Sequence, residues 1–118
     1  MSQHGFNADE VDVSPEQVAR ERERGAVQLV DVREDAEWDA GRIAGARHIQ
    51  LGQVAAQAAT IDRERPVVFY CRVGSRSTMA ADAFRRAGYD AYSMDGGLIA
   101  WADRGLPLEP EDGTVAGH

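Results

Sequence analysis

The residues best suited to chemistry lie in one short stretch, Cys71-Arg72-Val73-Gly74-Ser75-Arg76-Ser77. A thiol reacts as its thiolate, and an ordinary cysteine with a pKa of about 8.5 is mostly protonated at neutral pH. Backbone N–H groups turned inward by a loop with glycine, together with the charge of Arg72 and Arg76, would stabilise the thiolate. We therefore predict that Cys71 is a nucleophile held in an anion-binding loop.

The residues around this stretch predict a strand before the cysteine and a helix after it. The run 67–70 is β-branched or aromatic, as in a buried parallel strand, and Ser77 is a capping residue before a helical pattern. Cys71 is thus placed at the edge of the sheet where ligands bind in α/β proteins, and we expect its sulfur to face water. The predicted substrate-binding residues are Arg72, Val73, Gly74, Ser75 and Arg76.

A second charged loop is expected beside the first. Residues 28–32 are predicted to form another buried strand, and Asp31 and Arg33 lie at its end. Because the carboxyl ends of parallel strands meet at one edge of a sheet, both loops belong to the same edge. We expect Asp31 and Arg33 to support the site through an ion pair.

Strand and helix patterns alternate along the chain, which predicts an α/β fold with a doubly wound, mostly parallel sheet flanked by helices. Strands are expected at 28–32, 48–49, 67–70 and 91–94, and helices at 15–24, 34–39, 51–61, 77–87 and 98–104. Residues 11–108 form the predicted domain. Residues 1–10 and 109–118 are expected to be flexible tails.

Composition narrows the class of protein. The chain has 118 residues, enough for one domain, and a net charge of −7, which argues against a nucleic-acid or acidic membrane partner. A single cysteine requires no oxidising compartment, and no apolar run approaches eighteen residues, so a cytoplasmic protein is expected. No cofactor or metal is expected, since His48 has no second ligand nearby.

Four motifs in order resemble those of the single-domain rhodanese (thiosulfate sulfurtransferase-like) family. The resemblance covers about residues 14–108, with Arg42 and Ala44 where the family usually has His and Pro. The motifs are Asp31-Val32-Arg33-Glu34, Glu37-Trp38 followed by 41–46, the loop 71–77, and Gly96-Gly97-Leu98-Ile99-Ala100-Trp101. The resemblance implies a rhodanese-like fold and sulfurtransferase activity.

The resemblance further implies a transfer in two steps. Cys71 takes a sulfane sulfur from a small anionic donor such as thiosulfate, forms a persulfide, and passes the sulfur to an external thiol, a protein or another nucleophile. Without a second cysteine the chain cannot resolve its own persulfide as a disulfide, so the acceptor comes from outside. Neither a nucleic acid nor a membrane is implied.

Two other function classes stay open at the level of sequence. A rhodanese-like domain can be a non-catalytic binding or regulatory module, and an exposed thiol of low pKa can act as a redox sensor. A cysteine phosphatase also places a thiolate in an arginine-bearing loop, but those enzymes have five residues between cysteine and arginine. Only four separate Cys71 from Arg76, which disfavours a phosphatase.

Overall fold

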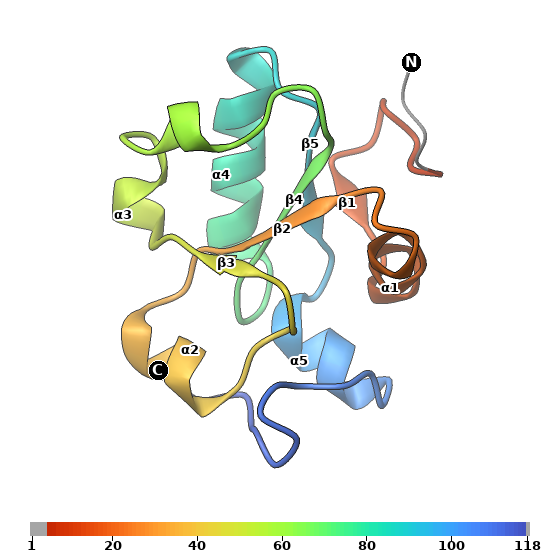
Figure 1. The fold of residues 1–118 in the computed structure, drawn as a ribbon, viewed down its shortest axis with the longest axis vertical. Helices are drawn as coiled ribbons and strands as arrows, with labels where there is room; N and C mark the ends of the chain where they lie inside the picture. Colours follow the sequence, from red (N-terminus) through yellow and green to blue (C-terminus); the bar gives the residue numbers. More distant parts are fainter. Residues whose placement is uncertain (1–4, 118) are drawn as a thin grey trace.

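Short parallel strands form a sheet at the centre of the molecule. In a computed structural model, which describes residues 5–117, five strands lie in the order β1-β5-β4-β2-β3 (Figure 1). Every neighbouring pair of strands in this sheet is parallel. The strands are β1 (Asp12–Val13), β2 (Gln28–Asp31), β3 (Arg47–His48), β4 (Val67–Tyr70) and β5 (Ala91–Met94). The predicted parallel α/β sheet is confirmed.

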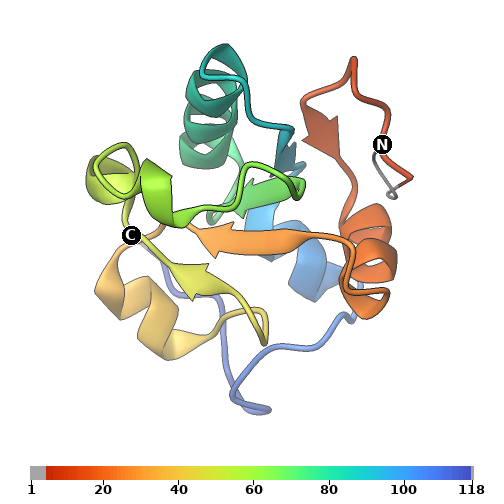
Figure 2. The same cartoon turned by 45° about the horizontal axis from the view of Figure 1, so that its top comes forward.

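Helices cover both faces of this sheet (Figures 1 and 2). On one face α3 (Leu51–Val54) packs beside α4 (Ser75–Arg86), and on the other α1 (Pro15–Glu23) packs beside α5 (Gly97–Asp103). α2 (Asp35–Ala40) follows the carboxyl end of β2. Within residues 5–117, no helix has the length and apolar character needed to cross a membrane.

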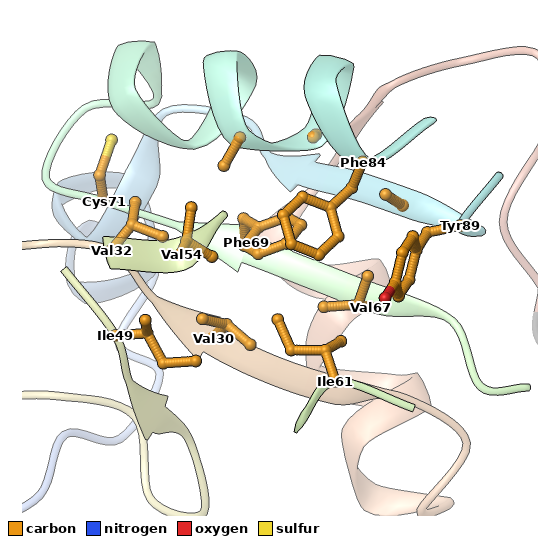
Figure 3. Packing of buried hydrophobic residues seen from close by; sticks show 13 residues of the cluster. Val30, Val32, Ile49, Val54, Ile61, Val67, Phe69, Cys71, Phe84 and Tyr89 are labelled. Atoms are coloured by element: carbon orange, nitrogen blue, oxygen red, sulfur yellow. The ribbon is translucent and has the colours of Figure 1, made fainter. Parts of the chain in front are cut away.

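The central strand β4 sends its side chains alternately to the two faces, because successive residues of a strand point in opposite directions. Phe69 and Cys71 belong to the cluster under α4, whereas Val68 and Tyr70 belong to the cluster under α1 and α5. Phe69 packs edge-on against Phe84 of α4, with ring centroids 4.9 Å apart (Figure 3). Strand alternation therefore places Cys71 on the face that α4 covers.

The start of α1 follows its sequence signals. The Ser14 hydroxyl oxygen accepts a hydrogen bond of 3.1 Å from the Gln17 amide, and the Gln17 side chain accepts one of 2.9 Å from the Ser14 amide. This capping box pairs two backbone donors that the helix itself leaves open, and Pro15 occupies the first helical position, where no N–H is needed. The predicted helix is confirmed.

The start of α4 differs from the prediction, because the helix begins at Ser75 and not beyond a cap at Ser77. Gly74 precedes the helix with a φ of 111°, a left-handed conformation that glycine adopts without steric cost. Ser77 does not cap the helix; its hydroxyl oxygen lies 2.8 Å from that of Ser93 in β5. The backbone at Gly74 therefore sets where α4 begins.

Two other elements differ from the sequence-based expectation. The single helix expected over 51–61 is divided into α3 and a 3₁₀ turn, Ala58–Thr60. Gly52 lowers helix stability by about 1 kcal/mol relative to alanine, and Val54 alone is buried within α3, so packing does not compensate. β1 was not expected because two residues carry no periodic pattern.

Described residues within 1–10 and 109–118, the segments expected to be flexible tails, contact the domain, and their flexibility stays a prediction. Phe6 packs on Tyr92 with ring centroids 4.9 Å apart. At the other end, the Thr114 amide donates to the Ala40 carbonyl at 2.8 Å. Single anchor residues such as these leave no periodic signal in a sequence. Residues 1–4 and 118 lie outside the described part, and the domain boundaries at 11 and 108 stay a prediction.

Candidate active site

Cys71 follows directly on β4, and the three loop residues 72–74 separate it from the start of α4 at Ser75. In Figure 3 its sulfur points toward the amino-terminal end of α4, away from the rings of Phe69 and Phe84. The strands are parallel, so the loop after β4 shares this edge of the sheet with the loop after β2. The predicted position of Cys71 between strand and helix is thus present in the structure.

Polar groups surround the sulfur on the side of the loop. The Gly74 amide donates a hydrogen bond of 3.1 Å to Cys71 Sγ, and the Ser77 hydroxyl oxygen lies 3.5 Å from the same atom. The first N–H groups of an α-helix have no carbonyl partner within the helix, so the helix itself leaves the amides at its start open to other acceptors. The loop therefore offers hydrogen-bond donors to an anion at the sulfur.

These donors change the acidity of the thiol. Burial raises the pKa of Cys71, but hydrogen bonds from the Ser77 hydroxyl and from the amides of Ser77, Gly74 and Val73 lower it more. The net pKa of the Cys71 thiol therefore lies below its ordinary value. A structural cysteine in apolar surroundings has a raised pKa, so the direction of this shift distinguishes Cys71 from a core thiol.

The expectation that the sulfur faces water is wrong for this structure. Cys71 is 0% exposed, because the loop folds back over the sulfur to bring the Gly74 amide against it. The loop that contacts the sulfur lies at the surface, since Val73 is 48% exposed and Ser75 is exposed as well. A substrate therefore reaches the sulfur only if the loop moves.

A chain of hydroxyl groups leads from the sulfur into the sheet. Ser77 lies between Cys71 and Ser93, whose hydroxyl oxygen is 2.8 Å from that of Ser77. The Thr78 hydroxyl donates to the Gly74 carbonyl at 2.8 Å. The single proton of the Ser77 hydroxyl has two acceptors within reach, the Gly74 carbonyl at 3.1 Å and the Cys71 sulfur at 3.5 Å, and a negative charge on the sulfur favours donation to the sulfur. Ser77 and Ser93 were absent from the predicted site, and a serine in a buried strand gives no sequence signal for this role.

The sequence led us to expect that the charges of Arg72 and Arg76 act on the sulfur. In the structure both arginines bind other groups. Arg76 forms a two-pronged ion pair with Glu37, with nitrogen–oxygen distances of 2.7 and 2.9 Å. Arg72 Nε donates to the Ala116 carbonyl at 3.1 Å. The lowered pKa of Cys71 is caused by hydrogen bonds, and Glu37 offsets much of the Arg76 charge. Glu37 was not predicted as a partner of the loop.

The ion pair expected between Asp31 and Arg33 is present. Arg33 Nη2 lies 2.6 Å from Asp31 Oδ2, and both side chains are fully buried. Arg33 also donates to the Gly41 carbonyl at 2.7 Å, which ties the loop after β2 to the end of α2. A buried pair of this kind becomes costly when one partner is removed, since the other charge is then unpaired. Its supporting role for the site stays a prediction.

The first turn of α5 holds the backbone of the cysteine loop. The Leu98 amide donates to the Cys71 carbonyl at 2.8 Å, and the Ile99 amide donates to the Arg72 carbonyl at 3.1 Å. Gly97 has a φ of 63°, and a Cβ there would overlap the Arg72 carbonyl and lie 2.6 Å from the Cys71 carbonyl. Glycine at this position thus allows α5 to approach the loop closely.

Fold and site together define a class of protein: single-domain α/β proteins with an ionisable cysteine on an amide-lined loop between a central strand and a helix. Comparison with known proteins agrees with this class. The rhodanese-like domain family matches residues 14–104, and the chain belongs to this family. The recognition made from the four sequence motifs is confirmed.

Named relatives add detail. The thiosulfate sulfurtransferase GlpE of Pseudomonas aeruginosa is 42% identical over 90 residues, which cover 75% of this chain and 81% of that protein. An HTH-type transcriptional regulator of Mycobacterium tuberculosis is 39% identical over 105 residues, or 86% of this chain, but this chain spans only 45% of the regulator. The sulfurtransferase relatives support the predicted enzyme class, a rhodanese-type sulfurtransferase.

Solved structures show the same fold. The solution structure of the rhodanese-like domain from the Anabaena protein Alr3790 superposes with a TM-score of 0.77 at 26% sequence identity. The superposition covers 92% of this chain and 87% of that domain. The rhodanese-like fold expected from the sequence is confirmed.

Proposed function

We propose that this protein is a sulfurtransferase in which Cys71 carries the transferred sulfur as a persulfide. The observation that carries the proposal is the set of donors around Cys71 Sγ, led by the Ser77 hydroxyl and the Gly74 amide, with the lowered thiol pKa that they cause. A stabilised thiolate is the form of cysteine that attacks sulfur, and no separate general base is needed to generate it.

The first step uses thiosulfate or a similar anionic donor. The Cys71 thiolate attacks the outer sulfur, a new sulfur–sulfur bond forms, and the bond to the sulfonate group breaks. Sulfite leaves with the electron pair of that bond, so the charge balances without an added oxidant or reductant. The persulfide that remains is anionic at its outer sulfur, where backbone N–H groups of residues 72–76 stabilise it.

The second step requires an acceptor from outside the chain. A thiolate attacks the outer sulfur of the persulfide, and the Cys71 thiolate leaves with the electrons of the broken bond. The chain has one cysteine, so no internal thiol competes for the sulfur. The acceptor is an external thiol, a protein thiol or another nucleophile, and we place the reaction in the cytoplasm, where a single reduced cysteine persists.

Access to the sulfur comes from movement of the cysteine loop. Cys71 is fully buried, and Gly74 occupies a left-handed conformation at the point where the loop turns back. Val73 and Ser75 on either side of Gly74 are exposed, so their displacement breaks few packing contacts. The added sulfur of the persulfide needs space at this point as well. We therefore assign to the segment 73–75 the opening that admits the donor.

A turnover assay tests the proposal. The protein is incubated with thiosulfate, and release of sulfite and transfer of sulfur to cyanide or glutathione are followed. Turnover is expected for the unaltered chain and none for Cys71→Ser, which keeps nearly the same side-chain size. Absence of turnover with each of these acceptors, in protein shown to be folded, would contradict the proposal.

A regulatory or redox-sensing module is the second candidate, and the likeness to a transcriptional regulator favours it. Such a module needs the fold and the thiol but no turnover. Exposure to peroxide distinguishes the two: oxygen adducts on Cys71 without persulfide formation from thiosulfate indicate a sensor.

A phosphatase is the third candidate, and the Arg76–Glu37 ion pair argues against it. The guanidinium at the end of the loop is engaged by a carboxylate at 2.7 Å, which would compete with a phosphate group for the same donors. Turnover of an aryl phosphate would overturn this preference.

A further inference from the structure

We propose that a hollow at the amino-terminal end of β2 and β3 binds a small organic anion that carries two or more phosphate or carboxylate groups. The hollow has a volume of about 540 Å³, and three arginines, Arg22, Arg47 and Arg65, line it. Gln28, the first residue of β2, lines it too. Cys71 lies beyond the other end of the parallel strands, so this site is separate from the sulfur chemistry.

The arrangement of elements explains how distant parts of the sequence meet there. Arg22 lies on α1, which sits beside the start of β2 in both views of the fold (Figures 1 and 2). Arg47 is the first residue of β3, the neighbour of β2 in the sheet, and Arg65 lies in the turn before β4. Three segments separated along the chain thus contribute one arginine each.

The hollow is positively charged within an acidic protein. No aspartate or glutamate is among the described residues that line it. Within residues 5–117, the three arginines form no ion pair, whereas Arg33 and Arg76 are each paired with a carboxylate. With a net charge of −7, the chain has carboxylates in excess, yet no carboxylate of the described residues pairs with these three arginines. A local positive potential of this kind attracts anions.

The guanidinium groups are held in place by backbone carbonyls, which carry no net charge. Arg22 Nε donates to the Ala44 carbonyl at 3.0 Å. Arg65 Nη2 donates to the carbonyls of Gly25 and Val27, and Arg47 Nη1 to that of Thr60. Each guanidinium has five N–H donors, so donors remain on all three. Because the side chains are already anchored, binding a ligand costs less conformational entropy than it would with free arginines.

The size and walls of the hollow indicate the class of ligand. Small-molecule sites have volumes of about 300–1,000 Å³, and this hollow lies within that range, with more room than one inorganic anion fills. Val27 and Leu29 give it apolar walls, which suit the carbon skeleton of an organic ligand. Guanidinium groups match carboxylate and phosphate oxygens in two-pronged geometry. An organic anion with at least two such groups satisfies both features.

Isothermal titration calorimetry at low ionic strength tests this site with two probes, citrate for carboxylates and fructose 1,6-bisphosphate for phosphates. We expect one-to-one binding of at least one probe, and the tighter probe identifies the preferred group. The double variant Arg22→Gln/Arg47→Gln should weaken that binding by at least about tenfold, because it removes charged donors.

A matched control separates a built site from general charge attraction. Arg20→Gln/Arg86→Gln changes the net charge equally, at two exposed arginines outside the hollow. Arg20 lies two positions from Arg22, about 200° around α1. This control should bind the probe within about twofold of the unaltered protein. Cys71→Ser should bind unchanged, and Arg22→Gln/Arg47→Gln should keep any turnover with thiosulfate.

Several results would overturn the proposal. The proposal is overturned if neither probe binds, if both double variants lose affinity equally, or if Cys71→Ser abolishes binding. If Arg22→Gln/Arg47→Gln unfolds at a lower temperature than the control, the single variant Arg47→Gln takes its place, because Arg47 is exposed. Unchanged affinity in that folded single variant would also contradict the proposal.

Discussion

Replacing Ser77 by alanine should raise the pKa of the Cys71 thiol by about one to two units. The Ser77 hydroxyl lies 3.5 Å from the sulfur, and its hydrogen bond is the largest of the effects that lower the thiol pKa. A hydrogen bond to a charged group contributes about 1.5–3 kcal/mol, and one pKa unit corresponds to about 1.4 kcal/mol. Loss of this bond destabilises the thiolate by that amount, while the amides of Gly74 and Val73 still hold it.

The pKa is measured from the ultraviolet absorbance of the thiolate as the pH is raised, and independently from the rate of alkylation by iodoacetamide. Ser75→Ala is the matched control, since it removes an exposed hydroxyl from the same helix turn and keeps the backbone amide. Ser93→Ala should cause a smaller rise, because Ser93 acts through Ser77. An unchanged pKa in folded Ser77→Ala would refute the reasoning, as would an equal rise in Ser75→Ala.

Three further predictions concern the surroundings of the loop. Gly97→Ala should lower the free energy of unfolding by at least about 1–2 kcal/mol, measured in urea, because alanine is strained at a φ of 63° and its methyl overlaps the Arg72 carbonyl. Arg76→Ala should raise the pKa of Cys71 and Glu37→Gln should lower it, each by less than about one unit in the same titration. If both variants shifted the pKa in the same direction, the claim that Glu37 offsets the charge of Arg76 would be contradicted. The lowered pKa of Cys71 should stabilise the folded protein relative to Cys71→Ser. This gain should be complete above the ordinary pKa of a cysteine thiol and should vanish as the pH falls through the lowered pKa of the folded protein. A difference in urea unfolding that does not change with pH would refute it.

The path of the chain around Cys71 could be predicted from local patterns. Four apolar residues fix β4, and the capping box at Ser14 fixes α1. The ion pair between Asp31 and Arg33 could also be predicted, because its members are two residues apart at the end of one strand. Each of these features depends on neighbours in the sequence.

The remainder of the site depends on contacts between distant segments. Glu37 and Arg76 are 39 residues apart, and no local pattern joins them. Ser77 and Ser93 come from different elements and meet only because α4 packs on β5. The exposure of Cys71 could not be predicted, because the loop that covers the sulfur is shaped by Gly74 and by the approach of α5 at Gly97. Sequence patterns therefore identified the nucleophile but not the groups that set its acidity and access.

The most direct test of the account is the intact mass of the protein after incubation with thiosulfate. The account predicts a gain of one sulfur atom on Cys71, reversed by an external thiol and absent in Cys71→Ser. An unchanged mass in folded protein would contradict it, as would an equal gain in the Cys71→Ser variant.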